Sequence, residues 1–116
     1  MVLSEKNNSL FFTDSGPMGE TNIENPTGSI FAIDLGVSML KPIVCGKLAH
    51  PCGLALSPNE NVMYVAETLM NRVLRVVIHS SGVYHTSTFY QFSGRLGPTA
   101  IAVSPAGLIY VARYDF

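Results

Sequence analysis

Short apolar runs separated by turn residues fill the middle of the chain. Residues 54–56 and 62–66 are almost wholly apolar, and the five residues between them include a proline and two asparagines of the kind that build tight turns. Successive side chains of a strand point to opposite faces, and in residues 72–78 one face is wholly apolar while the other mixes apolar and polar residues. The wholly apolar side of this run consists of Leu74, Val76 and Ile78. The pattern predicts three short β-strands joined by turns.

The same order of strands and turns recurs on either side of this unit. A spacing of 47 residues separates Pro51 from Pro98, and each proline is followed by small residues, an apolar triplet and Ser-Pro. The corresponding segments are 51–58 with 98–105, 63–66 with 109–112, 10–14 with 63–67, and 28–33 with 71–76. A repeat of about 40 to 50 residues built from short strands is typical of a β-propeller blade.

Composition and charge narrow the class of protein. Of the 116 residues, 47% are hydrophobic and only 13% are charged, which predicts that much of the surface contacts another structure. The net charge of −1 provides no basic surface for nucleic acid or acidic membranes. No apolar run approaches the ~18 residues of a membrane-spanning helix. We therefore expect no nucleic-acid partner and no membrane span in this segment.

The start of the chain and its cysteines bear on the cellular compartment. Residues 1–8 are polar, so we expect a turn there rather than a signal peptide, and a soluble, cytoplasmic protein is favoured. Cys45 and Cys52 are too few for a disulfide framework and are not spaced like a zinc motif. We expect two free thiols, with a bridge only in an oxidising compartment.

Residues 15–27 are rich in Gly, Pro, Asn and Thr and predict a loop inserted at one rim. The carboxylates of Asp14, Glu20 and Glu24 suggest a calcium loop as an alternative. Met18 falls where an oxygen ligand is needed and no helices flank the segment, so a solvated loop is the preferred interpretation.

Four segments carry a resemblance to a known family. They are Leu-Phe-Phe-Thr-Asp-Ser at 10–15, Gly-Ser-Ile-Phe-Ala-Ile-Asp at 28–34, His-Pro-Cys-Gly-Leu-Ala-Leu-Ser-Pro at 50–58, and Val-Ala-Glu-Thr-x-x-Asn-Arg-Val-Leu-Arg at 65–75. They resemble the strictosidine synthase-like branch of the gluconolactonase and senescence-marker-protein superfamily, including its adipocyte plasma membrane-associated members.

The resemblance implies an all-β fold, an arc of about two and a half four-stranded blades of a six-bladed β-propeller. Residues 1–49 would hold the end of one blade, residues 50–96 a complete blade, and residues 97–116 the start of the next. An isolated arc leaves two blade faces bare. The expected partners are therefore the missing blades of a longer polypeptide or further copies of the chain, together with a small-molecule ligand in the central channel.

The resemblance also maps candidate site residues onto the mouth of the channel. These are Asp14, His50, Cys52, Glu67, Thr99 and Arg113. In the lactonase branch Asn and Asp bind a divalent cation where this chain has Cys52 and Thr99, and a thiol and a hydroxyl are poor ligands for calcium. We expect no metal or other cofactor. Asp14 and Glu67 are the weak candidates, and calcium would need ligands from outside the chain.

The residues themselves leave alternatives open. Cys52 is either a nucleophile with His50 as its base or, as we prefer, a small residue packed at the channel. Glu67 and Arg113 occupy corresponding places in neighbouring units and suggest an ion pair across the rim, while Asp14 fits a local hydrogen-bonding role at a strand end. His79 and His85 are expected at the surface, and Arg72 and Arg75 on a solvated or inter-blade face.

Two functions remain. The preferred hypothesis is a propeller scaffold that binds a ligand or partner through its channel mouth and the loop 15–27. The alternative is part of a hydrolase of lactonase or arylesterase type, or of a synthase-like enzyme, acting on a small molecule. The chain alone is expected to be inactive, and its catalytic residues are unknown.

Overall fold

The computed structural model describes residues 1–6, 8–14, 26–79, 83–93 and 97–113, and every regular element within them is a β-strand. The strands are β1 (Val2–Ser4), β2 (Ser9–Asp14), β3 (Gly28–Asp34), β4 (Met39–Leu48), β5 (Pro51–Leu56), β6 (Val62–Glu67), β7 (Arg72–Ile78), β8 (Tyr84–Gln91), β9 (Pro98–Val103) and β10 (Ile109–Arg113). The all-β prediction is confirmed.

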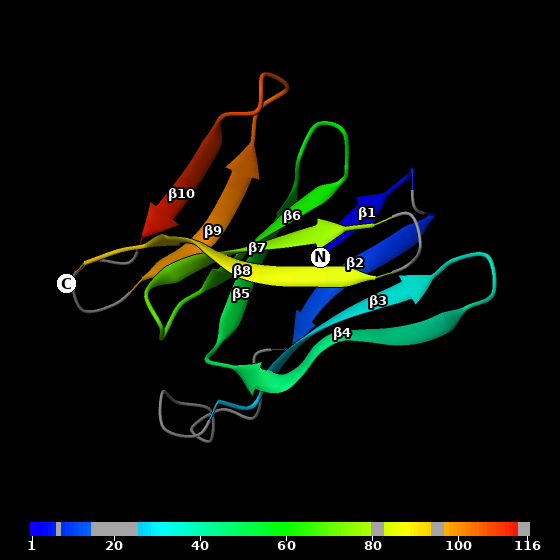
Figure 1. Cartoon of the computed structure of the whole chain (residues 1–116), viewed down its shortest axis with the longest axis horizontal. Coiled ribbons are helices and arrows are strands. Elements are labelled where there is room, and N and C mark those ends of the chain that lie inside the picture. Colours follow the sequence, from blue (N-terminus) through cyan, green and yellow to red (C-terminus); the bar gives the residue numbers. More distant parts are fainter. Residues whose placement is uncertain (7, 15–25, 80–82, 94–96, 114–116) are drawn as a thin grey trace.

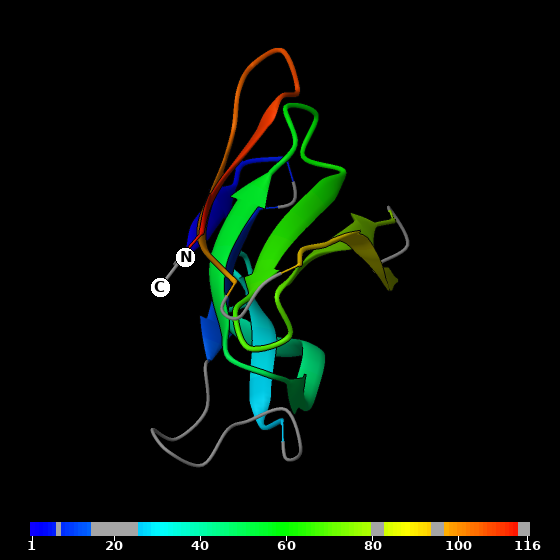
Figure 2. The same ribbon diagram turned by 90° about the vertical axis from the view of Figure 1, so that its left-hand side faces the viewer.

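The strands form three antiparallel sheets in chain order. The first sheet is β1-β2-β3-β4, the second is β5-β6-β7-β8, and the third contains β9 and β10. The second sheet lies between the other two (Figure 1). Figure 2 shows β4 and β8 on one side of the molecule and β9 and β10 on the other. The arrangement is an arc of propeller blades, as the repeat predicts.

The first sheet has one strand more than the sequence predicted. We expected a polar turn at the start of the chain, but β1 pairs with β2, Val2 lying opposite Phe11 and Ser4 opposite Ser9. Ser4 is fully buried. Pairing satisfies backbone groups whatever the side chains, so a strand of three residues gives almost no sequence signal.

A buried apolar layer holds the first and second sheets together. Its members alternate along their strands, as expected where one face of a sheet is covered. The buried residues are Phe11, Ile30, Ala32, Leu48, Met63, Val65, Leu74, Val76 and Ile78. We call this layer the first interface. It includes the apolar side of residues 72–78 that the alternation predicted.

A close approach of backbones and a hydrogen bond from a side chain to the backbone make the second interface, between the second and third sheets. A Cβ added to Gly53 would lie 3.0 Å from the Cα of Ala100, so β5 approaches β9 more closely than a larger residue allows. The hydroxyl of Thr68 donates a hydrogen bond of 2.7 Å to the carbonyl of Pro98. These contacts fix the start of β9 against the second sheet.

A polar contact joins the first two sheets at one end. The Glu60 carboxylate, in the turn between β5 and β6, accepts hydrogen bonds from the backbone N–H groups of Glu5 at 3.0 Å and Lys6 at 3.4 Å. The Lys6 ammonium in turn contacts the side chain of Asn61. The turn between β1 and β2 is thereby held to the turn of the next sheet.

The first interface predicts a large difference between two apolar truncations. Phe11→Ala removes a fully buried ring and should lower the free energy of unfolding by about 3–5 kcal/mol. Leu40→Ala removes a side chain that is 55% exposed and should change it by less than about 0.5 kcal/mol. Urea unfolding followed by circular dichroism measures both. Equal losses would contradict packing of the two sheets through Phe11.

Candidate functional site

The candidate residues lie where β2, β6 and β10 end and where β5 and β9 begin. The hydroxyl of Thr13, next to Asp14, is 3.4 Å from the carbonyl oxygen of Cys52, to which it donates a hydrogen bond. Gly53 packs against the backbone of residues 99–101. These contacts bring the end of β2 and the starts of β5 and β9 to one rim of the arc.

Cys52 and Thr99 share a backbone irregularity at that rim. In the second sheet Pro51 lies opposite Glu67 and Gly53 opposite Ala66, which leaves Cys52 as an extra residue in β5. Thr99 has the same position in β9, because Pro98 lies opposite Arg113 and Ala100 opposite Ala112. A β-bulge re-aims the side chain of its extra residue.

The bulge changes the expected environment of Cys52. We predicted a small residue packed at the channel, but the Cys52 side chain is exposed. Thr99 is half-buried, and its hydroxyl donates a hydrogen bond of 3.4 Å to the carbonyl of Ala112. Cysteine side chains are usually buried, but this one lies at a shift in strand register and is exposed. A register shift of this kind cannot be predicted from a single sequence.

His50 precedes the bulge in a left-handed conformation, with φ of 55°. Its carbonyl accepts the backbone N–H of Thr68 at 3.1 Å. A catalytic pair with Cys52 on one face of a strand needs regular extended backbone between the two residues. The positive φ of His50 and the bulge at Cys52 remove that regularity.

Glu67 is a structural residue in this arrangement. Its side chain is 1% exposed and forms an ion pair with Arg72, which lies directly opposite on β7. Its second carboxylate oxygen accepts the backbone N–H of Ala49 at 2.7 Å. The carboxylate thus joins the turn after β6 to the connection between β4 and β5, with both oxygens engaged. We expected Arg72 on a solvated or inter-blade face and missed this partner.

The proposed ion pair between Glu67 and Arg113 does not form. The Arg113 guanidinium donates a hydrogen bond of 2.6 Å to the carbonyl of Ser93 and lies 4.6 Å from the centre of the Phe92 ring. Arg113 therefore fixes the segment that follows β8, and Glu67 binds Arg72 instead. Corresponding positions in neighbouring repeats have different partners.

Asp14 is exposed at the end of β2. The predicted loop 15–27 and its carboxylates Glu20 and Glu24 fall largely outside the described residues, which resume at 26. Of the two weak metal candidates, Asp14 is thus at the accessible end of a strand, while Glu67 is committed to a buried ion pair.

At this rim the side chains that the structure describes do not fit a calcium site. Within the described ranges no three His, Cys, Asp or Glu residues gather into a group that could hold a metal ion. The residues re-aimed by the bulges are a thiol and a hydroxyl, whereas calcium takes six or more oxygen ligands. We assign no chemical step to a cation at this rim.

The chain matches one protein family over almost its whole length. The SMP-30/Gluconolactonase/LRE-like region model covers residues 2–116. The chain belongs to this family. Among curated relatives, lactonase drp35 of Staphylococcus epidermidis is 30% identical over 93 residues, which cover 77% of this chain and 28% of the relative. The Staphylococcus aureus protein of the same name is 30% identical over 94 residues.

Solved structures of SMP-30/gluconolactonase proteins share the fold. A calcium-binding protein, regucalcin, from Agrobacterium tumefaciens superposes with a TM-score of 0.76 at 21% identity, covering 93% of this chain and 36% of that one. A gluconolactonase from Xanthomonas campestris gives 0.74 at 22% identity, covering 97% and 41%. The chain spans less than a third of the length of the lactonases it matches. No helix in the described part is long and apolar enough to cross a membrane.

The assignment of Glu67 predicts a stability effect. Glu67→Gln removes the charge that pairs with Arg72 and should lower the free energy of unfolding by about 1–3 kcal/mol. Glu5→Gln, at an exposed carboxylate, should change it by less than about 0.5 kcal/mol. Chemical denaturation of both variants gives the comparison. Combining Glu67→Gln with Arg72→Gln should cost less than the sum of the two single changes.

Proposed function

We propose that this chain forms part of the wall of a binding site for a small lactone or ester, in a protein of the lactonase type. The observation that supports this most directly is the repeated bulge, which re-aims Cys52 and Thr99 at equivalent points of β5 and β9, the strands that begin the second and third sheets. Regular strands would keep a fixed alternation of side chains. Bulges that recur at one rim are typical of positions that serve a site.

The names of the relatives support a lactone as the ligand. The curated proteins at 30% identity are lactonases, and one structural neighbour is a gluconolactonase. A lactone offers a carbonyl and a ring oxygen as hydrogen-bond acceptors, and the Thr99 hydroxyl has a single proton, which it donates to the Ala112 carbonyl over 3.4 Å. In this proposal the hydroxyl exchanges that long hydrogen bond for one to the ligand. In this proposal Thr99 supplies a polar contact and Cys52 a contact of small, polarisable surface.

Hydrolysis is proposed only for a longer polypeptide that carries this arc. Ring opening of a lactone adds water across the acyl C–O bond and needs a base for the water and a donor for the leaving oxygen. Within the described residues the buried carboxylate of Glu67 is held by Arg72 and Ala49. The groups that activate water would therefore come from other blades, and this segment would position the substrate.

A second candidate function is binding without turnover. It is favoured by the side chains at the bulges, because Cys52 and Thr99 replace the hard oxygen ligands that the lactonase branch has at the mapped positions. A scaffold of this kind would bind the same class of small molecule at the same rim. The two candidates differ in turnover and agree on the location of the ligand.

The two exposed cysteines provide a direct test of that location. Cys45 lies in β4 and Cys52 at the bulge of β5, and both thiols are free and accessible. With glucono-δ-lactone at about ten times its Kd, alkylation of Cys52 by iodoacetamide should slow about tenfold, since about a tenth of the sites stay open. The rate at Cys45 should not change. Peptide mass spectrometry measures both rates in one sample.

Equal rates with and without the lactone would contradict a site at Cys52, and slowing at both cysteines would indicate a general effect on the chain. Turnover separates the two candidate functions. The chain, and any longer native polypeptide that contains it, should be assayed with glucono-δ-lactone and phenyl acetate. Because the chain alone is expected to be inactive, the longer polypeptide decides: protection of Cys52 without turnover there supports the scaffold, whereas turnover there with a raised KM in Thr99→Val supports the hydrolase.

A further inference from the structure

Two histidine rings meet where β7 ends and β8 begins. The backbone N–H of His79, which follows the last residue of β7, donates a hydrogen bond of 3.0 Å to the carbonyl of Val83. Farther along the pair of strands, Val77 lies opposite His85. Because alternate residues of a strand share a face, His79 and His85 are diagonal neighbours on one face of the hairpin. Their ring centroids are 4.8 Å apart, and the ring planes are inclined at 70°.

Both rings are accessible, and the repeat indicates that a neighbouring sheet leaves this end of a hairpin open. His79 and His85 are exposed. In the repeat Asp34 corresponds to Val77, and Met39 lies opposite Asp34 as His85 lies opposite Val77. Met39 is 54% exposed, although the second sheet packs against the first. The position that His85 occupies is therefore accessible even in a sheet whose face is covered.

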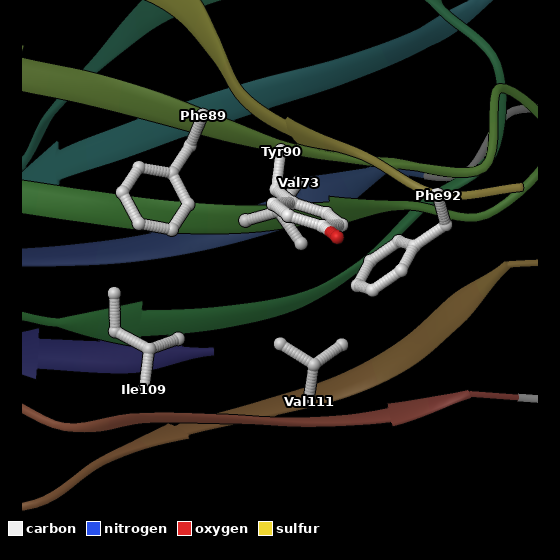
Figure 3. Close-up of a pocket in the computed structure, with 6 residues that line it drawn as sticks. All are labelled: Val73, Phe89, Tyr90, Phe92, Ile109 and Val111. Atoms are coloured by element: carbon white, nitrogen blue, oxygen red, sulfur yellow. The ribbon is translucent and has the colours of Figure 1, made fainter.

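The two ends of the β7–β8 pair differ in chemistry. At the far end Val73, Phe89 and Tyr90 line an apolar groove beside β10 (Figure 3). At the near end the histidines provide ring nitrogens, and residues 76–94 contain no Asp, Glu, Lys or Arg. Imidazole nitrogens are good ligands for zinc, nickel and copper, whereas calcium takes oxygen ligands. The segment therefore favours a borderline transition-metal ion over a hard one.

The separation of the two rings fits a single shared ion. With a zinc–nitrogen bond of ~2.0–2.1 Å, about 1.2 Å from each nitrogen to its ring centre and a bond angle of about 90–109°, the centroids lie about 4.6–5.4 Å apart. The centroids of His79 and His85 are 4.8 Å apart. Because the backbone already holds the two rings side by side, binding an ion requires little further ordering.

We propose that His79 and His85 form a surface site for one divalent transition-metal ion of the zinc, nickel or copper class. One ring nitrogen of each side chain binds the ion, and water completes its coordination, because among the described residues no third His, Cys, Asp or Glu joins the pair. The bound ion links the end of β7 to the start of β8. The inference is independent of the ligand proposed for the rim at Cys52.

Titration of the whole chain with zinc tests the site. The chain is prepared without a histidine tag, and Cys45 and Cys52 are first alkylated with iodoacetamide so that thiolates do not bind the metal. Isothermal titration calorimetry should show one zinc ion per chain. His79→Gln and His85→Gln should each weaken binding at least about tenfold, because each removes one of two ligands. His50→Asn removes the third histidine of the chain and should leave the zinc affinity unchanged.

Hydrogen exchange locates the ion on the hairpin. With zinc at about ten times its Kd, amides that exchange when β7 and β8 separate should exchange about tenfold more slowly, since the ion binds only the closed hairpin. The amide of His79, which is bonded to the carbonyl of Val83, is one of them. Calcium at the same concentration should have no effect, because two imidazoles are poor ligands for a hard ion.

Three results would overturn the proposal. They are the absence of zinc binding by the alkylated chain, unchanged affinity in His79→Gln or His85→Gln, and equal weakening by His50→Asn. One ion shared by two chains, seen as half-stoichiometry and as a dimer in light scattering, would also overturn it in favour of a site between copies. Protection of Cys52 by glucono-δ-lactone is measured without zinc, so failure here leaves the proposed function as it stands.

Discussion

Face-to-face packing of strongly apolar sheets is the constraint on which the rest of this structure depends. Each sheet has apolar side chains on both faces, so it can be covered only by a neighbour on each side. The second sheet comes closest to this state: Val65 and Val76 are fully buried toward the first sheet, and Val73 is 1% exposed on the opposite face. The end sheets have one neighbour each. The high hydrophobic fraction of a chain of this size follows from that geometry.

Packing of this kind restricts where the chain can carry polar groups. The packed sheet faces are occupied by apolar contacts, so the carboxylates that join the sheets lie in turns and at strand ends, while the exposed outer strand β8 carries polar residues along its length. Glu60 uses its carboxylate to hold the turn at Glu5 and Lys6, and Glu67 uses its own to hold the connection at Ala49. A carboxylate that accepts backbone N–H groups between sheets fixes their relative position more than a surface ion pair does.

The sequence predicted the fold well because the repeat and the strand alternation are encoded residue by residue. The apolar side of residues 72–78, the correspondence of Pro51 with Pro98, and the turns between strands all depend on local chemistry. Three features escaped prediction. β1 depends on backbone pairing, the exposure of Cys52 depends on a register shift, and the pairing of Glu67 with Arg72 depends on which residues lie opposite across a hairpin. Each is a relation between two strands, which a pattern along one strand does not contain.

The mapped site illustrates the same distinction. Alignment within the repeat places Glu67 and Arg113 at equivalent positions, yet one is a buried ion-pair partner and the other stacks on Phe92 at the surface. The same alignment places Cys52 and Thr99 at equivalent positions, and there the structure is also equivalent, down to the extra residue in each strand. A repeat therefore conserves the backbone more reliably than the role of a side chain. For a binding site built on β5 and β9, the recurring bulge is a stronger guide than residue identity. The bulge determines which side chains change direction, whatever the chemistry of those side chains.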